Sequence, residues 1–398
     1  MTFDADKLAQ CVGCGMCLSA CPTYAVTGLE QHNPRGRLVG MRLVHDGELS
    51  TLDPDYVDSM EGCVQCRACE PACPSLVEFG ALMETARTDI EAARAHAPSR
   101  GGGRLRSSLV RWGLGLLRRP VLLRLGTILL SLAQLTRADR LLPRRLRLAR
   151  RVRLRELAGR LPARQRADAW LFRGCVMDVW FRGAHGATLR LLERSGYRVD
   201  AARRGACCGA LDLHQGFEDR AARSAAEVIA AHRGTSGPVV VDSAGCGAAM
   251  KEYGRLLGTE EARVFADRVR DMSELVDPNT LPAGVLREPV AYQHACHLRN
   301  VQHVESAPVA LLDRVLGPGQ LRRTADGERC CGAGGAYNAL RPDLAEPIGA
   351  RKRDAVTATG ATRVTSGNPG CLLQLAQHGL PVVHIAEVLW EAVETAER

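Results

Sequence analysis

Eight cysteines near the start of the chain stand in two identical runs, and cysteine thiolates at short, fixed spacing are ligands for metal centres. Each run reads C-x2-C-x2-C-x3-C-P, over residues 11–22 and again over residues 63–74. Three thiolates on such a tight turn hold three irons of one [4Fe–4S] cube, and the fourth thiolate reaches a second cube. Zinc is the weaker alternative, because structural zinc sites use two C-x2-C pairs rather than runs of four cysteines.

This spacing is that of bacterial two-cluster ferredoxins, in which the fourth cysteine of each run serves the other cluster. Cluster 1 is therefore predicted to have the ligands Cys11, Cys14, Cys17 and Cys73. Cluster 2 is predicted to have the ligands Cys63, Cys66, Cys69 and Cys21. Helix formers dominate residues 76–97, so we expect an α-helical ferredoxin domain over residues 1–100. Residues 33–37 (NPRGR) predict a turn whose arginines face a cluster, a partner or solvent.

The other eight cysteines form an internal repeat in the second half of the chain. The first copy contains Cys175, Cys207, Cys208 and Cys246, and the second contains Cys296, Cys330, Cys331 and Cys371. The intervals before and after the vicinal pair are 32 and 38 residues in the first copy and 34 and 40 in the second. We therefore predict two units of one architecture, over residues 166–280 and 281–398. Each set of thiols is a candidate metal or iron–sulfur site, with catalytic thiols and structural cysteines as alternatives.

Apolar and helix-forming runs alternate in both units. The strands are predicted over residues 169–172, 238–242, 290–293 and 362–365, and the helices over 187–196, 221–232, 307–316 and 344–358. Such alternation implies parallel sheets with helices on both faces, and it puts the cysteines at the carboxyl ends of strands, where α/β folds place their sites. His214, His294 and His297 fall near these loops, although a lone histidine is more often a structural group than a ligand.

Residues 101–165 form a basic connector between the two halves and contain no cysteine. Eighteen arginines and two acids stand between Arg104 and Arg166, in a chain whose formal net charge is +9. Residues 107–135 are mostly apolar, and Pro120 is expected to break or kink a helix there. A basic helix pair of this kind covers the protein's own core, a partner subunit or a membrane surface, and the sequence leaves all three open.

Composition excludes several classes of protein. Aromatic residues make up 4% of the chain and no recognition motif accompanies the arginines, so no nucleic-acid partner is expected. No uncharged apolar stretch is long enough to span a membrane, and the opening residues lack the apolar core of a secretory signal. Clustered cysteines in such a chain indicate metal or redox chemistry in a reducing cytosol. We expect a cytoplasmic protein. Peripheral contact with the inner face of the cell membrane is compatible with that expectation.

Several runs around the later cysteines resemble the cysteine-rich CCG-domain family, joined here to a two-cluster ferredoxin domain. They are SAGCGAAMKEYG from Ser243, ACHL from Ala295, CCGAG from Cys330 and NPGC from Asn368. Iron–sulfur subunits of glycolate oxidase, anaerobic glycerol-3-phosphate dehydrogenase, lactate-utilisation proteins and heterodisulfide reductase share this arrangement, and the runs are most similar to those of the glycolate oxidase subunits. The resemblance implies electron transfer during oxidation of glycolate to glyoxylate, with FAD carried on partner subunits.

The chain departs from the fuller CCG pattern at one position in each unit. Relatives with a fifth cysteine end in C-x2-C and hold non-cubane clusters, whereas Ser243 and Asn368 stand at those positions here. Four thiolates per unit leave an ordinary iron–sulfur cluster, zinc or an empty site as the alternatives.

No glycine-rich dinucleotide motif follows a predicted strand, so we expect a flavoprotein partner to oxidise the substrate. This chain would then carry single electrons towards an acceptor such as quinone. The alternatives are the iron–sulfur subunit of anaerobic glycerol-3-phosphate dehydrogenase or of lactate oxidation, and a thiol redox enzyme like heterodisulfide reductase.

Overall fold

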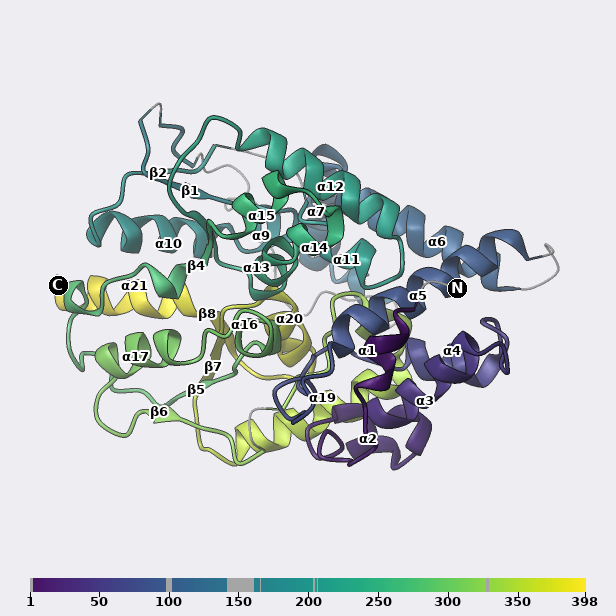
Figure 1. Ribbon diagram of the computed structural model, residues 1–398. Helices are drawn as coiled ribbons and strands as arrows, with labels where there is room; N and C mark the ends of the chain where they lie inside the picture. The colour runs from purple at the N-terminus through teal and green to yellow at the C-terminus, as the bar shows by residue number, and fades with distance from the viewer. Residues whose placement is uncertain are drawn as a thin grey trace.

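The computed structural model describes residues 3–97, 102–141, 161–164, 166–202, 205, 207–326 and 329–398. A helical N-terminal part lies beside two α/β units that are stacked one above the other in Figure 1. This arrangement confirms the predicted fold class, an α-helical domain followed by two repeated α/β units with parallel sheets. No helix in the described part of the chain is both long enough and apolar enough to cross a membrane.

The only regular secondary structure in the described residues of the N-terminal part is helical. Its elements are α1 (Ala5–Ala9), α2 (Pro22–Thr27), η1 (Glu30–His32), α3 (Pro34–His45), α4 (Pro54–Glu61) and α5 (Phe79–His96). Apolar side chains from α3, α4 and α5 form its core, among them Met41, Met60 and Met83. The same core contains Cys63 and Cys69, so the helices hold the cysteine loops against a packed interior.

The predicted turn over residues 33–37 is wrong, because these residues begin a helix. Asn33 is the N-cap of α3, and its side chain accepts a hydrogen bond from the Gly36 backbone N–H at 2.9 Å. Pro34 occupies the first turn of the helix, where its missing N–H costs nothing. An Asn-Pro pair is typical both of a turn and of the first residues of a helix. Here the helix forms because Leu38, Met41 and Val44 recur at helical spacing and are buried.

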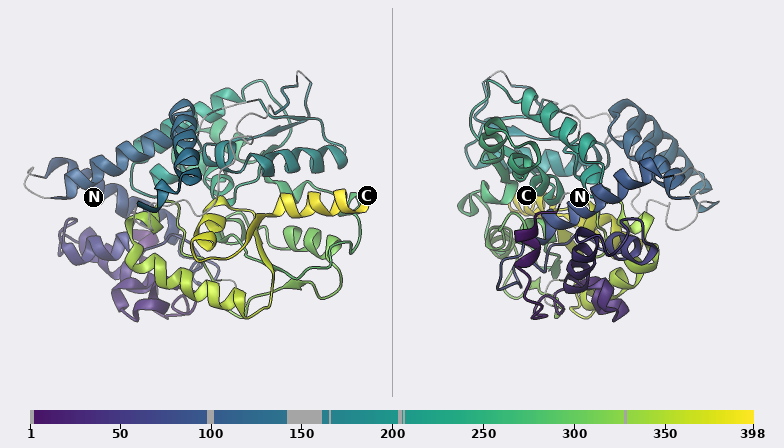
Figure 2. Two further views of the ribbon diagram at one scale, coloured as in Figure 1. Left: turned by 180° about the vertical axis from the view of Figure 1, so that it is seen from behind. Right: turned by 45° about the vertical axis from the view of Figure 1, so that its right-hand side comes forward.

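The connector forms a helical hairpin, α6 (Gly102–Leu117) and α7 (Pro120–Leu135), followed by η2 (Ala138–Leu141). The predicted break at Pro120 is confirmed, since Pro120 is the first residue of α7. Figure 2 shows the hairpin along one edge of the molecule. Residues 142–160 and Gln165 of the predicted connector lie outside the described residues.

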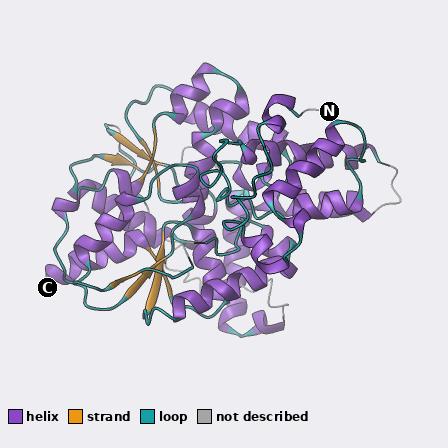
Figure 3. Cartoon of the chain, turned by 60° about the horizontal axis from the view of Figure 1, so that its bottom comes forward, coloured by secondary structure: helices purple, strands orange, loops and turns teal. Residues whose placement is uncertain are grey.

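Each α/β unit is built on a four-stranded parallel sheet, and both sheets have the same topology (Figure 3). The first has the order β2-β1-β3-β4 and the second the order β6-β5-β7-β8. The strands are β1 (Ala169–Leu171), β2 (Val199–Asp200), β3 (Val239–Val241), β4 (Val269–Asp271), β5 (Val290–Tyr292), β6 (Leu321–Arg322), β7 (Arg363–Ser366) and β8 (Val382–His384). The four predicted strands are thus the central pair of each sheet.

Helices cover both sheets and carry the cysteine loops. In unit one they are α9 (Val176–Trp180), α10 (Arg182–Arg194), α11 (Ala210–Leu213), α12 (Glu218–Ala231), α13 (Ala244–Lys251), α14 (Tyr253–Leu257) and α15 (Glu260–Ala266). The short turns η4 (Met272–Glu274) and η5 (Pro278–Thr280) lead to unit two. That unit has α16 (Cys296–Asn300), α17 (Ser306–Val315), α18 (Tyr337–Leu340), α19 (Pro342–Thr357), α20 (Pro369–Gln377) and α21 (Ile385–Ala396).

The two units share one hydrophobic core. Helix α21 packs against both α10 and α17, so apolar residues of all three helices belong to the same cluster. A buried polar link crosses the same junction: His384 Nε2 donates to the Asp242 carbonyl at 2.9 Å, and His185 Nδ1 lies 2.7 Å from the Asp242 carboxylate. The two cysteine sites are therefore held at a fixed separation.

The contact between the N-terminal part and unit one yields a stability test. Gly216, in the loop before α12, has φ +77°, and a Cβ there would lie 2.3 Å from the carbonyl oxygen of Arg87 in α5. We expect Gly216→Ala to lower the free energy of unfolding by about 2 kcal/mol or more, because backbone cannot yield as a side chain can. Thermal unfolding of anaerobically prepared protein measures the effect.

Gly234 supplies the matched control. It has φ +72° in the loop after α12, and nothing lies within 4 Å of its Cβ position. Gly234→Ala should therefore cost only the left-handed backbone penalty of about 1 kcal/mol. Equal losses in the two variants would contradict the close docking of α5 on unit one.

Candidate metal centres

Four predicted ligands of the first cluster line one cavity. Cys11, Cys14, Cys17 and Cys73 all face it, together with Cys69. The last cysteine of the second run thus lies beside the first three cysteines of the first run, as exchanged fourth ligands require. Cys14 is the exposed member of the set, and the others are half-buried or buried. The cavity is therefore at the surface of the molecule on the side of Cys14.

Two arginines of α3 hold the first cysteine loop through its backbone. Arg42 Nη2 donates to the carbonyls of Leu8 and Cys11, at 2.7 Å each, and Arg35 Nη1 donates to Gly13 O at 3.2 Å. Arg35 therefore faces a cysteine loop, which was one of the alternatives predicted for it. Burial raises the pKa of the Cys17 thiol, and backbone N–H groups of Cys17 and Arg35 oppose that rise.

The second cysteine loop divides its thiols between two neighbourhoods. Cys69 is buried near Cys63 and Cys21, and burial raises the pKa of its thiol well above the ordinary value. The Cys21 thiol lies 3.1 Å from Thr23 Oγ1. Cys66 instead packs in a separate cluster with Cys330 and Cys296 of unit two. The hydrogen bond to Cys330, and then burial, raise the pKa of the Cys66 thiol.

The two cysteine loops have the same backbone conformation at equivalent positions. Gly13 and Gly15 have φ of +74° and +80° in the first loop, and Gln65 and Arg67 have φ of 56° and 57° in the second. Glycine adopts this left-handed region freely, whereas other residues are strained there. The second loop therefore needs contacts outside itself to keep its shape.

Those contacts come from the side chains of the strained residues. Gln65 Nε2 donates to the carbonyl of His214 in unit one at 2.9 Å. Arg67 pairs with Glu70 at 2.8 Å and with Glu252, at the end of α13. Arg255 of α14 completes the network by pairing with Glu84 of α5 and lying 3.4 Å from Glu252. The pairs Arg67–Glu252 and Arg255–Glu84 thus join the second loop and α5 to unit one.

Backbone carbonyls of the second loop are acceptors for side chains distant in sequence. In unit two, Tyr337 Oη donates to Gly62 O at 3.0 Å, His297 Nε2 to Gln65 O at 2.9 Å and Asn300 Nδ2 to Cys66 O at 2.9 Å. Arg87 of α5 donates to Cys63 O at 2.6 Å. Sequence reasoning placed His297 near the cysteine loops, but it gave no role to Arg87, Asn300 or Tyr337, because only the fold brings them to the second loop.

Burial disfavours the charged form of all three histidines near the cysteine loops. Burial lowers the pKa of His297 and, further, that of His214, whose ring centroid lies 5.2 Å from that of His297. Burial also lowers the pKa of His294 to about 4. His297 donates from Nε2 to a carbonyl. The expectation that such histidines are structural agrees with these contacts.

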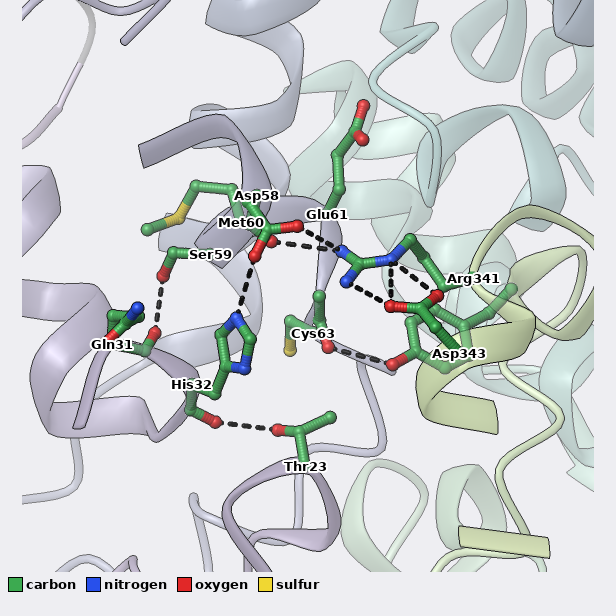
Figure 4. A network of polar contacts seen from close by, with 12 residues as sticks. Thr23, Gln31, His32, Asp58, Ser59, Met60, Glu61, Cys63, Arg341 and Asp343 are labelled. Carbon is green, nitrogen blue, oxygen red and sulfur yellow. Dashed lines mark hydrogen bonds and ion pairs between the residues drawn. The ribbon is translucent and has the colours of Figure 1, made fainter. Parts of the chain in front are cut away.

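Figure 4 shows a polar network that runs from Arg341 through Asp58 and His32 to Thr23. Arg341, between α18 and α19, lies 3.2 Å from the Asp58 carboxylate, which in turn lies 3.0 Å from His32 Nε2. Thr23 Oγ1 donates to the His32 carbonyl at 2.8 Å and touches the Cys21 thiol. Unit two therefore braces the fourth cysteine of the first run as well as the second loop.

Unit one brings its four cysteines together at the carboxyl edge of its sheet. The sulfurs of Cys175 and Cys207 lie 4.0 Å apart, and Cys208 interacts with both Cys207 and Cys246. Cys175 and Cys207 pack under Leu123 of α7. Hydrogen bonds from the Cys175 and Cys208 thiols lower the pKa of Cys207 well below its usual value.

Unit two repeats this arrangement. Cys330 interacts with Cys296 and Cys331, and Cys331 interacts with Cys371. Asn368, at the position of the missing fifth cysteine, is 3.4 Å from the Cys371 sulfur through Nδ2. Across the parts of the chain that the structure describes, no three His, Cys, Asp or Glu side chains are arranged to hold a single metal ion.

Comparison with known proteins places this geometry in a family. Residues 7–77 match the 4Fe–4S dicluster domain, and residues 169–251 and 290–376 each match the cysteine-rich domain. The probable glycolate oxidase iron–sulfur subunit of Bacillus subtilis (strain 168) is 34% identical over 429 residues, covering 98% of this chain and 95% of the relative. The chain belongs to the glycolate oxidase iron–sulfur subunit family.

Other relatives include a second glycolate oxidase subunit and proteins of lactate utilization. The glycolate oxidase iron–sulfur subunit of Escherichia coli (strain K12) is 29% identical over 409 residues, which cover 98% of this chain and 96% of the relative. Lactate utilization protein A of Bacillus pumilus (strain SAFR-032) is 28% identical over 235 residues, or 55% of this chain and 97% of the relative. The family resemblance predicted from the cysteine runs is confirmed, and the chain is an iron–sulfur electron-transfer subunit of the oxidoreductase class.

The ion network at α5 predicts how stability depends on pH. Burial raises the pKa of Glu84 to about 7, against about 4.3 in an unfolded chain. Between these values the folded state binds more protons, so the free energy of unfolding should fall by about 2 kcal/mol as pH rises from 5 to 7. In Glu84→Gln this part of the pH dependence should disappear in denaturant titrations at pH 5, 6, 7 and 8.

Glu260→Gln is the control, because Glu260 is an exposed residue of α15 whose only described pair is with Arg263 on the same helix. It should leave the pH dependence as in the wild type. A wild-type stability that rises between pH 5 and 7, or an unchanged slope in Glu84→Gln, would contradict a protonated Glu84 in the folded state.

Proposed function

We propose that this chain is the iron–sulfur subunit of a glycolate oxidase complex and carries two [4Fe–4S] clusters. The proposed ligands are Cys11, Cys14, Cys17 and Cys73 for cluster 1 and Cys21, Cys63, Cys66 and Cys69 for cluster 2. The observation that carries the proposal is the cavity that combines the first run with Cys73. Relatives with nearly full coverage that are named glycolate oxidase subunits support the substrate.

Substrate oxidation takes place on FAD-containing partner subunits in this proposal. Oxidation of glycolate to glyoxylate removes two electrons, and a flavin divides such a pair into single electrons. When bound, the clusters supply one-electron transfer towards an acceptor such as quinone. The chain's own residues hold the loops, bury one site and expose the other. The complex would be cytoplasmic and peripheral at the inner face of the cell membrane.

The burial of the two ligand sets supports a direction for electron flow. Cys14 is exposed, and the neighbouring side chains of Val12 and Met16 are exposed as well. Cys63, Cys66 and Cys69 are all buried. Electron exchange with another protein needs close approach, so the first loop is the proposed point of contact for the flavoprotein. The second loop would pass electrons inside the molecule.

The four-cysteine sites of the two α/β units are proposed to hold an additional iron–sulfur cluster or zinc. The donor chemistry is suitable, because thiolates bind both zinc and iron–sulfur clusters and backbone N–H groups point at Cys207 and Cys330. Among the described residues the thiols are not arranged around a single metal ion, so loading would have to draw them closer together. Cys66 packs beside Cys330, which puts the unit-two site next to the second loop. A metal there would extend the electron path from cluster 2 into unit two.

Lactate is the second candidate substrate of the complex. The relatives named lactate utilization protein A match just over half of this chain. The two acids are both 2-hydroxy acids, and discrimination between them would be made on the partner subunit. The iron–sulfur subunit itself would be the same kind of electron carrier in both complexes.

Iron analysis of anaerobically purified protein tests the clusters. The proposal requires about eight irons for the two cubes, and any excess of iron or zinc reports on the α/β units. Cys14→Ser should lose about half of the eight irons and one EPR signal while the far-ultraviolet circular dichroism stays unchanged. Ser19→Ala, in the same loop, should keep all of the iron. Colourless, iron-poor protein, or full iron in Cys14→Ser, would refute the ligand assignment.

Substrate-driven reduction tests the complex. In the complex purified with its flavoprotein subunits, glycolate should bleach the iron–sulfur absorption, and Cys14→Ser should reduce the extent of bleaching. Glycerol 3-phosphate should have no effect, because its oxidation needs a different flavoprotein. Bleaching by glycerol 3-phosphate but not by glycolate would overturn the choice of substrate, and bleaching by lactate alone would favour the second candidate.

A further inference from the structure

Helix α7 presents its apolar residues to the outside and its small polar residues to the protein. Its buried positions are Leu123, Thr127 and Ser131, each one turn from the next. Its exposed positions include Leu129 and Leu135, with 68% and 74% of their surface accessible, and a further set of apolar residues: Val121, Leu122, Leu125, Ile128 and Leu132. A surface helix of a soluble protein has the opposite arrangement.

The contacts of the buried face fix this orientation. Trp180 Nε1 donates to Thr127 Oγ1 at 3.0 Å, and Thr127 in turn donates to the Leu123 carbonyl at 2.6 Å. Leu123 packs over Cys175 and Cys207 of unit one. Rotating α7 to hide its leucines would break these contacts. The apolar outer face is therefore a consequence of how the helix docks, and it has no cover within the described chain.

Helix α6 extends the same surface. Leu105, Leu109 and Trp112 are exposed at intervals of four and three residues, which places them on one face. Ion pairs on the other side anchor the helix, from Arg106 to Glu61 and from Arg111 to Asp219 at 2.9 Å. Figure 2 shows α6 and α7 together at the edge of the molecule.

The charge around this surface is positive. Acids of the N-terminal part and of unit one pair with Arg106, Arg111, Arg118 and Arg124 of the hairpin. Arg104, Arg119 and Arg137 are exposed. In the sequence, eight more arginines stand between residues 142 and 160, against the single acid Glu156. Leucines, an exposed tryptophan and guanidinium groups together match the chemistry of an anionic lipid surface.

We propose that the outer face of the α6–α7 hairpin lies in the interface of an anionic lipid bilayer and anchors the subunit there. The leucines and Trp112 enter the boundary between headgroups and acyl chains, and the arginines contact lipid phosphates. Neither helix is long enough to cross the bilayer. This deepens the peripheral placement in the proposed function and does not depend on the identity of the substrate.

Flotation of the full-length, iron-loaded protein with vesicles tests the proposal. With phosphatidylcholine vesicles containing phosphatidylglycerol, the wild type should float, and with pure phosphatidylcholine or at high salt it should float less. The variant Leu125→Glu/Leu129→Glu should lower the partition coefficient at least about tenfold, because two anchoring side chains are replaced by anions. Both leucines are exposed, so iron content and thermal midpoint should not change.

Val264→Glu is the matched control, since Val264 is equally exposed on α15, away from the hairpin. It should float as the wild type does. A wild type that stays at the bottom of the gradient with anionic vesicles, or a double variant that floats unchanged, overturns the proposal.

Two further outcomes separate this proposal from its alternatives. Lack of flotation together with loss of the flavoprotein in the double variant would identify the face as a protein interface and overturn the lipid proposal. A wild type that shows glycolate-driven bleaching but does not float would overturn the lipid proposal alone. Flotation without bleaching would overturn the proposed function alone.

Discussion

Backbone carbonyls of the second cysteine loop must find donors, because the loop is buried and a carbonyl without a partner is costly there. The donors are Arg87, His297, Asn300 and Tyr337, and three of these four belong to unit two. The loop therefore takes its full set of hydrogen bonds only when unit two is folded and docked. These hydrogen bonds join the ferredoxin part to unit two and fix the backbone that carries the thiols of the second loop.

The two cysteine loops meet the same backbone requirement by different means. In the first loop, Gly13 and Gly15 take the left-handed conformation without strain and leave the surface open around Cys14. In the second loop, Gln65 and Arg67 take that conformation and use their side chains to bind unit one. The strain of about 1–2 kcal/mol per residue is offset by these contacts. The first loop is exposed around Cys14 and the second is buried, although both have the same cysteine spacing.

Local spacing explains what was predictable from the sequence. The cysteine runs, the repeat and the central strands are each encoded within a few residues, and all appear in the structure. The edge strands β2 and β6 have two residues each, which is too short for a periodic pattern. The turn of Cys66 towards Cys330 and the four donors of the second loop depend on docking between distant segments. The hydropathy of α7 predicted a helix, but only the packing of Leu123 and Thr127 shows which face is outside.

The two α/β units diverged in what covers their thiols, although their topology is identical. In unit one, Leu123 of α7 packs in one apolar cluster with Cys175 and Cys207. In unit two the equivalent thiols, Cys296 and Cys330, contact Cys66 of the second loop. The thiols thus pack against helix α7 in unit one and against the second cysteine loop in unit two. The second copy has a thiol of the ferredoxin part in direct contact with its own thiols. Two scaffolds of one topology therefore differ in the segment that is docked on their thiols, α7 in the first and the second cysteine loop in the second.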